Sequence, residues 1–296
     1  KRIQFVACGT SLHAAKTARK WFEDICEIPC YIDFASEYRY RNPIVEDHTL
    51  FVTISQSGET ADTLAALEYA RAEKYVGIVT ICNVPTSTMA RNADWKIFTN
   101  AGPEIGVAST KAFTTQLAAL LMLALSIAKS QDKNAKKRKQ ATQELRETPA
   151  LVDQAFSLKE NISQITQNIS TKHNALFLGR GMYFSIAQEG ALKLKEISYI
   201  HAEAYPAGEL KHGPLALVDE QIPVIALAPE DSLVEKLLSN LEEVKARGGT
   251  LYVFGNANST IEVKKGKFIN MPDCGDYNAP IIYTIPLQIL AYEVAC

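Results

Sequence analysis

Residues 50–60 read Leu-Phe-Val-Thr-Ile-Ser-Gln-Ser-Gly-Glu-Thr and contain the pattern from which the class of fold can be predicted. Its first half, Leu50–Ile54, is apolar and rich in β-branched residues, which is typical of a strand buried on both faces. Small polar residues and a glycine follow, and the amphipathic segment Thr60–Lys74 then predicts a helix. A buried strand, a short loop and a helix form the unit from which a helix-covered parallel sheet is built.

The same alternation continues along the chain. Short apolar strand-like runs recur on both sides of the quoted stretch, and amphipathic segments such as Ser232–Arg247 separate them. The further runs are Ile3–Ala7, Gly77–Ile81, Ala175–Leu178, Val224–Leu227 and Leu251–Phe254. We therefore expect βαβ units with right-handed crossovers, arranged as a three-layer α/β/α sandwich around a mostly parallel, doubly wound sheet.

Four pairs of similar segments indicate an internal repeat. Each pair is separated by 172 or 173 residues, whereas chance similarities would have scattered offsets. The pairs are Gly9 with Gly181, Ala35–Glu37 with Ala207–Glu209, Leu50–Ser55 with Ile222–Ala228, and Thr80–Asn83 with Val253–Asn256. We predict two tandem copies of one α/β domain at residues 1–130 and 173–296, joined at residues 131–172 by a helical linker and a helix leading into the second domain.

Charge and composition argue against several classes of protein. The 296 residues carry 31 Lys and Arg against 33 Asp and Glu, so neither a nucleic-acid groove nor a surface for anionic membranes is expected. The basic run Lys136–Lys139 is interpreted as a solvated helix face or linker. The longest apolar run, Leu117–Ala128, is shorter than the about 20 residues that span a bilayer, which favours a core helix.

The six cysteines are interpreted as reduced, buried thiols. None forms a Cys-x-x-Cys pair and no histidine cluster accompanies Cys26 and Cys30, so neither a zinc site nor any other metal site is predicted. The chain begins Lys-Arg-Ile-Gln-Phe-Val, with neither an initiator Met nor a signal peptide pattern. We expect a piece of a longer cytoplasmic protein.

The loop Ser55–Thr60 is a candidate phosphate site. It precedes a helix, where free N–H groups and the positive end of the helix dipole converge. Ser55, Ser57 and Thr60 can add hydroxyl donors and Gly58 permits close backbone approach, while the lack of lysine excludes a Walker A loop and favours a monophosphate. The alternative is an ordinary helix N-cap. The corresponding Pro229–Ser232 is acidic and would repel phosphate, which favours a single site in the first copy.

Two further segments open helices with small or hydroxyl-bearing residues, Cys8–Ser11 and Val107–Lys111. The first does not match the Gly-x-Gly-x-x-Gly pattern of dinucleotide sites. Because ligands of open α/β sheets bind at the carboxyl ends of the strands, both segments are expected to line one pocket with the Ser55–Thr60 loop.

A helix in the second copy presents candidate catalytic side chains. Within Ser185–Ile197, a rotation of 100° per residue places Glu189, Lys193 and Glu196 on one face, within about 60° of each other. One interpretation is an exposed ladder of ion pairs, worth about a few tenths of a kcal/mol each. The other is a confined carboxylate that serves as a general base.

His212 is a second candidate for acid–base chemistry. Gly213 and Pro214 follow it, and histidines in such loops often act in function. The other four histidines, at positions 13, 48, 173 and 201, lack this setting and are interpreted as structural or surface residues.

Three motifs together resemble the glucosamine-6-phosphate synthase family, the isomerising glutamine–fructose-6-phosphate aminotransferases. They are Ser55–Thr60, Gly106–Lys111 and Ala191–Glu203, and the resemblance covers essentially the whole chain as two SIS (sugar isomerase) domains. It implies the ketose–aldose isomerase part of such an enzyme, binding fructose 6-phosphate, glucosamine 6-phosphate or glucose 6-phosphate. In the full-length family members, glutamine-derived ammonia completes glucosamine 6-phosphate, the first committed step of hexosamine and UDP-N-acetylglucosamine synthesis.

The resemblance also implies roles for particular residues, without a metal or cofactor. Glu196 would move a proton between C1 and C2 with Lys193 and Glu189 near it, and His212 would open the sugar ring from across a homodimer interface. The substrate-binding residues fall into a phosphate set and a sugar set. The phosphate set is Ser11, Ser55, Gln56, Ser57 and Thr60, and the sugar set is Cys8, Gly9, Thr10, Val107 and Ser109.

Two parts of the family's enzymes have no counterpart in this sequence, the N-terminal glutaminase domain and the C-terminal tail with its Schiff-base lysine. We therefore expect a fragment that retains proton transfer and does not complete the amination. Two alternatives remain open. One is an SIS deglycase acting on fructosamine 6-phosphates, and the other is a non-catalytic SIS module that senses phosphosugars.

Overall fold

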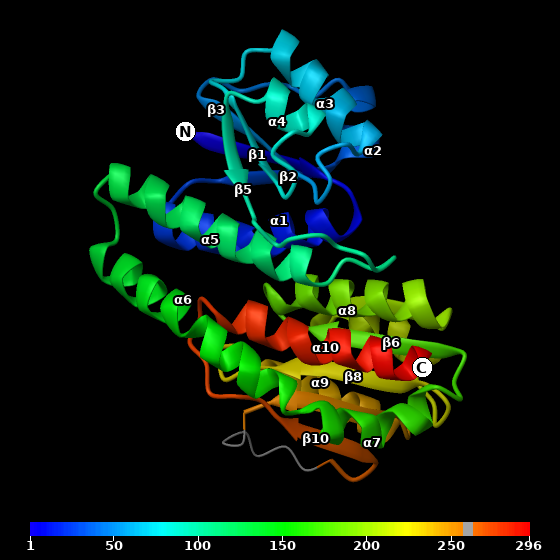
Figure 1. The fold of residues 1–296 in the computed structure, drawn as a ribbon. Coiled ribbons are helices and arrows are strands. Elements are labelled where there is room, and N and C mark those ends of the chain that lie inside the picture. Colours follow the sequence, from blue (N-terminus) through cyan, green and yellow to red (C-terminus); the bar gives the residue numbers. More distant parts are fainter. Residues whose placement is uncertain (257–262) are drawn as a thin grey trace. The chain divides into compact units, whose positions relative to one another are not determined.

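Two five-stranded, fully parallel sheets form the centres of two α/β units, residues 1–142 and 143–296, in the computed structural model (Figure 1). The structure describes residues 1–256 and 263–296, and the division between the units falls within the helix α6 (Ala135–Phe156). The predicted fold class, two tandem α/β/α domains with parallel doubly wound sheets, is confirmed. The domain boundaries at residues 130 and 172 stay a prediction.

The sheet of the first unit has the strand order β2-β1-β3-β4-β5. Its strands are β1 (Arg2–Ala7), β2 (Cys30–Phe34), β3 (Thr49–Ile54), β4 (Ile78–Cys82) and β5 (Trp95–Phe98). Helices cover both faces, with α1 packed against α5 on one and α3 packed against α2 and α4 on the other (Figure 1). These helices are α1 (Gly9–Trp21), α2 (Ala35–Tyr38), α3 (Ala61–Ala72), α4 (Thr88–Asn92) and α5 (Lys111–Ser130), with shorter turns η1 (Phe22–Cys26) and η2 (Arg39–Arg41).

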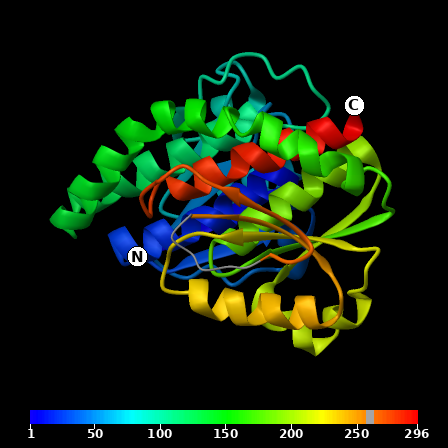
Figure 2. The ribbon, with the colours of Figure 1, turned by 90° about the horizontal axis from the view of Figure 1, so that it is seen from below.

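The sheet of the second unit has the order β10-β9-β8-β6-β7. Its strands are β6 (Asn174–Gly179), β7 (His201–Pro206), β8 (Pro223–Ala228), β9 (Thr250–Gly255) and β10 (Gly266–Asn270). On one face α10 packs against α7 and α8, and α9 lies on the other face beside η3 (Figure 2). These helices are α7 (Lys159–Ile169), α8 (Tyr183–Ser198), η3 (Ala207–His212), η4 (Pro214–Leu217), α9 (Val234–Ala246) and α10 (Ala279–Ala295).

The two units repeat the same topology, as the segment pairs predict. The order β2-β1-β3-β4-β5 of the first sheet corresponds to the order β7-β6-β8-β9-β10 of the second. In each sheet, the strand that comes first in the sequence lies between the second and the third. Gly9 and Gly181 each lie two residues after the end of the first strand of their sheet, where the chain turns into α1 and α8. Their φ angles are positive, 49° and 54°, a backbone conformation that favours glycine. The duplication is therefore a property of backbone geometry as well as of sequence.

The six predicted strands are the central strands of the two sheets, and all four missed strands lie at the sheet edges. Central strands are buried at nearly every position, whereas the edge strands β2, β5, β7 and β10 are half-buried or exposed at most positions. An edge strand lacks one neighbour and carries polar residues such as Asp33 and Lys96, so it gives no apolar run to detect.

The apolar run Leu117–Ala128 lies in α5, which by length and composition alone could cross a membrane. Half of its apolar stretch is buried, however, and the helix packs on α1 as a core helix does. The basic run lies on α6, where Lys137 forms an ion pair with Asp24. All six cysteines are free thiols, but only Cys26, Cys30 and Cys82 are buried, while Cys8 and Cys274 are half-buried and Cys296 is exposed.

Gly190 allows α8 to approach β6 and α10 closely, and this generates a stability prediction. A Cβ atom there would lie 2.6 Å from Leu287 Cδ1 and 3.1 Å from Phe177 Cε1. A Gly190→Leu substitution overpacks this contact and is expected to lower the free energy of unfolding by about 1–3 kcal/mol. Urea unfolding measures it, with Lys195→Leu on the exposed side of α8 as the matched control, expected to change stability by at most about 0.5 kcal/mol. Equal midpoints for the two variants would contradict the packing argument.

Candidate functional site

The strand order of the first unit places the topological switch point of its sheet between β1 and β3. The chain leaves these two neighbours for opposite faces of the sheet, and in doubly wound sheets ligands bind outside the carboxyl ends of such a pair. Ala7 is paired with Ile54 in the register of the two strands. The next residues, Cys8 and Ser55, therefore begin neighbouring loops. That these loops line one pocket together with residues 107–111 stays a prediction.

Hydroxyl groups organise the Ser55–Thr60 loop from within. The buried Ser55 Oγ accepts the N–H of Gly58 at 3.0 Å and forms a hydrogen bond with Thr60 Oγ1, also at 3.0 Å. Ser57 Oγ accepts the N–H of Glu59 at 3.1 Å, and Gly58 adopts a positive φ of 68°. The loop is thus a tight turn with half-exposed side chains at Gln56, Ser57 and Thr60.

Thr60 occupies the N-cap position of α3, but its side chain does not cap the helix. The hydroxyl faces Ser55 instead, so no side chain from this residue neutralises the first-turn N–H groups of α3. This differs from the ordinary N-cap considered as the alternative. Backbone donors, hydroxyls and a helix dipole at one point are what an anion site requires.

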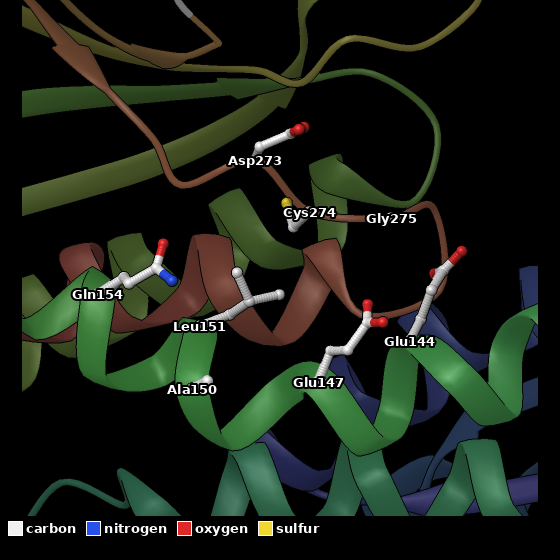
Figure 3. A pocket seen from close by; sticks show the side chains of 8 residues that line it. All are labelled: Glu144, Glu147, Ala150, Leu151, Gln154, Asp273, Cys274 and Gly275. Carbon is white, nitrogen blue, oxygen red and sulfur yellow. The ribbon is translucent and has the colours of Figure 1, made fainter.

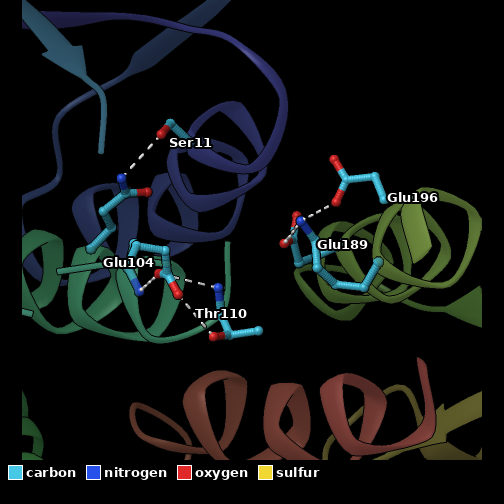
Figure 4. A network of polar contacts seen from close by, with 8 residues as sticks. Ser11, Glu104, Thr110, Glu189 and Glu196 are labelled. Carbon is cyan, nitrogen blue, oxygen red and sulfur yellow. Dashed lines mark hydrogen bonds and ion pairs between the residues drawn. The ribbon is translucent and has the colours of Figure 1, made fainter. Parts of the chain in front are cut away.

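The residues that follow β1 are placed less uniformly. Gly9 is exposed and Thr10 is half-buried, while Ser11 is buried and accepts a hydrogen bond at 3.0 Å from Gln116 Nε2 of α5 (Figure 4). Cys8 Sγ lies 3.8 Å from the Thr63 hydroxyl. Gln116 was not predicted, and its only signal in the sequence is a lone amide within an otherwise apolar helix.

Glu104, which no sequence pattern singles out, holds the start of α5. Its carboxylate accepts the N–H of Ala112 at 2.9 Å, the N–H of Thr110 at 3.3 Å and the Thr110 hydroxyl at 3.1 Å (Figure 4). A carboxylate therefore already occupies this helix N-terminus and engages the Thr110 hydroxyl. The predicted sugar-binding residues lie beside it, with Val107 94% exposed and Ser109 half-buried.

Glu189, Lys193 and Glu196 form one ion-pair network on α8, which confirms that they share a face. Lys193 Nζ lies 2.6 Å from Glu196 Oε2 and 3.4 Å from Glu189 Oε1 (Figure 4). Glu189 and Lys193 are only 1% and 2% exposed, so the interpretation as an exposed ladder is wrong for these two residues. The Glu196 side chain retains 32% exposure.

The burial of this network has an electrostatic consequence. A buried ammonium is tolerated when carboxylates compensate it, and two carboxylates around one ammonium leave a single negative charge. Of the two carboxylates, that of Glu196 is the accessible one. The arrangement holds an anionic side chain at a fixed position at the edge of a buried cluster, which is what a general base needs.

His212 lies apart from this network within the second unit. It is exposed at the end of η3, before Gly213 with its positive φ of 141°. Across residues 1–256 and 263–296, no hydrogen bond or ion pair joins His212 to the three α8 side chains. Within the described residues, these two candidate catalytic elements are therefore not joined by a polar interaction.

In the second unit, the loop between β8 and α9 corresponds to the Ser55–Thr60 loop and carries a carboxylate. Asp231 Oδ1 accepts the N–H of Leu233 at 2.8 Å, directly before α9, and burial raises the pKa of this carboxyl. A cavity of about 150 Å³ borders the same loop and has further carboxyl groups at Glu230, Asp273 and Asp276. This acidic lining disfavours phosphate, as the sequence comparison of the two copies predicts.

A larger cavity of about 560 Å³ lies between α6 and the loop after β10 (Figure 3). Its polar walls include Glu144, Glu147, Asp273 and the thiol of Cys274, whose pKa burial raises to about 12. The lining is again acidic. Among residues 1–256 and 263–296, no three His, Cys, Asp or Glu side chains gather in a way that could hold a metal ion.

Comparisons with known proteins match the whole chain. The SIS domain family model matches residues 1–126 and 168–296. Glutamine–fructose-6-phosphate aminotransferases [isomerizing] from Legionella pneumophila (strain Lens) and Pseudomonas aeruginosa are each 55% identical over 295 and 297 residues, all of this chain. The chain spans about half the length of these curated relatives, 48% and 49%.

A solved structure is similar over the full length. It is the C-terminal domain of glucosamine-fructose-6-phosphate aminotransferase from Francisella tularensis, with 51% identity and a TM-score of 0.98, covering all of this chain and 84% of that one. With its repeated topology and its family match in both halves, the chain belongs to the SIS domain family, in the group that includes the C-terminal domain of the glucosamine-fructose-6-phosphate aminotransferases.

Proposed function

We propose that this chain is the ketose–aldose isomerase part of a glutamine–fructose-6-phosphate aminotransferase. The observation that carries the proposal is the full-length similarity to the C-terminal domain of such an enzyme, at 51% identity and a TM-score of 0.98. In the proposed reaction, fructose 6-phosphate is converted to glucosamine 6-phosphate with ammonia from a glutaminase domain in the full-length protein. The reaction begins hexosamine synthesis, and the protein is proposed to act in the cytoplasm.

The Ser55–Thr60 loop is the proposed binding site for the sugar phosphate. Its support is the position at the carboxyl ends of β1 and β3, the uncapped start of α3 and the hydroxyls around it. Ser55, Gln56, Ser57 and Thr60 would donate to the phosphate oxygens, while Cys8, Gly9, Thr10, Val107 and Ser109 would line the sugar. Ser11 would support the phosphate, and in the structure it is buried and accepts a hydrogen bond from Gln116.

Glu196 is the proposed base. Moving a proton between C1 and C2 requires removal of a weakly acidic C–H proton by one positioned base, together with stabilisation of the charge that develops on oxygen. Lys193 Nζ lies 2.6 Å from Glu196 Oε2 and so holds the Glu196 carboxylate in place. Glu189 in turn helps to compensate the charge of the buried Lys193. The general acid–base step is the chain's own chemistry and requires neither metal nor organic cofactor.

His212 is the proposed residue for sugar-ring opening, contributed by the second subunit of a homodimer. Its exposed position at the end of η3, before a glycine with a positive φ, leaves the imidazole accessible to a partner subunit. An imidazole can donate a proton from one ring nitrogen and accept one at the other, so it can exchange protons with the ring oxygen and the anomeric hydroxyl.

Removing one loop hydroxyl tests phosphate binding. Thr60→Val keeps the side-chain shape but loses a donor to a charged group, so the Kd for fructose 6-phosphate should rise about 10- to 100-fold. Isothermal titration measures it, with Thr142→Val on the exposed surface of α6 as a matched control that binds like wild type. Unchanged affinity in Thr60→Val would contradict the site.

Replacing the proposed base tests the chemistry. Glu196→Gln retains the shape and an oxygen for Lys193 but cannot take up a proton, so exchange of the C1 and C2 protons should fall about 10²- to 10⁴-fold. Deuterium incorporation from heavy water into the phosphosugar, followed by NMR, measures this rate, and phosphosugar affinity should stay at the wild-type level. Glu235→Gln on exposed α9 serves as control. Undiminished exchange in Glu196→Gln would rule out this base.

Mixing two inactive variants tests the shared site. If His212 acts on the partner's substrate, a heterodimer of Glu196→Gln and His212→Ala subunits has one site with both groups intact. Equimolar mixing with subunit exchange should then restore about a quarter of the wild-type exchange rate, because half the dimers are mixed and half of their sites are complete. If both groups of a site come from one subunit, mixing restores nothing.

A further inference from the structure

We propose that Glu59 is a positioning residue that holds the phosphate loop against α4. The proposal rests on the assignment of Ser55–Thr60 as the phosphate site and adds a residue to which no binding role has been given. Glu59 lies within the loop but is exposed, and its carboxylate points to the backbone of a different segment: Oε1 accepts the N–H of Thr88, the first residue of α4, at 2.7 Å.

Two backbone hydrogen bonds make the same connection. The carbonyl of Gln56 accepts the N–H of Asn83 at 3.0 Å, and the carbonyl of Gly58 accepts the N–H of Met89 at 3.1 Å. Three residues of the loop are thus attached to the segment 83–89, which follows β4. Glu59 supplies the one attachment that depends on a side chain.

Close packing at Gly58 completes the contact. A Cβ atom at Gly58 would lie 2.2 Å from the Oγ of the buried Ser87. That hydroxyl already caps α4 by accepting the N–H of Ala90 at 3.3 Å. The loop therefore lies directly on the α4 N-terminus, and a shift of α4 would displace the loop with it.

The charge of Glu59 supports a positioning role over a binding role. The N–H of Thr88 holds the pKa of this carboxyl below its usual range, so the side chain is anionic at neutral pH. An anion beside a phosphate site weakens binding by like-charge repulsion. The negative charge of Glu59 therefore weakens phosphate binding. It is favourable overall only if the hydrogen bond to α4, by fixing the loop, raises the affinity by more than the repulsion lowers it.

The hydrogen bond and the charge have opposite effects on affinity, so two variants separate them. Glu59→Ala loses the hydrogen bond, and the Kd for fructose 6-phosphate should rise about 5- to 10-fold, with the proton-exchange rate at saturation within about twofold of wild type. Glu59→Gln keeps a carbonyl oxygen for Thr88 and removes the charge, so its Kd should equal that of wild type or fall. Glu68→Ala, an exposed carboxylate on α3, is the matched control and should bind as wild type does.

The other partner of the hydrogen bond provides a second route. Thr88→Pro removes the N–H at the first helical position, where proline is tolerated, and Ser87 before it already has the extended φ and ψ of −66° and 158° that proline requires. It should weaken binding as Glu59→Ala does, and the double variant should be no weaker than either single one. Additive losses, or equal weakening in Glu59→Ala and Glu59→Gln, would overturn the proposal.

Amide hydrogen exchange distinguishes failure of this inference from failure of the proposed function. In Glu59→Ala, the amides of Gly58 and Glu59 should exchange at least about threefold faster than in Glu59→Gln and Glu68→Ala, without any ligand present. If wild type does not bind fructose 6-phosphate, the proposed function fails, and the exchange rates still decide whether Glu59 holds the loop. If wild type binds and Glu59→Ala binds equally well, only the positioning role is refuted.

Discussion

Parallel pairing of β1 with β3 is the constraint on which the proposed phosphate site depends. Parallel neighbours end at the same edge of a sheet, and here the chain continues to opposite faces, into α1 after β1 and into α3 after β3. The register that sets Ala7 beside Ile54 therefore brings two helix N-termini and two loops to one place. The second unit repeats this arrangement with β6 and β8, where Leu178 is paired with Ala226.

The two copies use the same position in different ways. In the first unit, Ser55 and Thr60 bond to each other and leave the start of α3 without a side-chain cap. In the second unit, the carboxylate of Asp231 lies at the start of α9. A carboxylate at a helix N-terminus has the electrostatic effect of a bound anion. The second copy therefore supplies from its own chain the negative group that, in the first copy, the proposed phosphate ligand would supply. This difference is consistent with a duplicated fold in which only the first copy carries the proposed phosphate site.

Carboxylates of loop residues accept hydrogen bonds from backbone N–H groups at the starts of several helices in this protein. Glu104 holds the start of α5 and Glu59 holds the start of α4, and both belong to loops that carry proposed substrate-binding residues. Such bonds fix the loop geometry in the absence of a ligand, and this lowers the entropic cost of ordering the loop on binding. The proposed recognition of phosphate by positioned hydroxyls and N–H groups needs no basic surface, which agrees with a chain whose net charge is only −2.

The class of fold, the central strands, the duplication and the shared face of Glu189, Lys193 and Glu196 are predictable from the sequence, because each follows from a local period or a fixed offset. The edge strands, the burial of Glu189 and Lys193 and the contact of Ser11 with Gln116 emerge only from the packed fold. Those two residues are 105 positions apart. Burial and such pairings depend on which distant segments pack together, and no local pattern of residues records that.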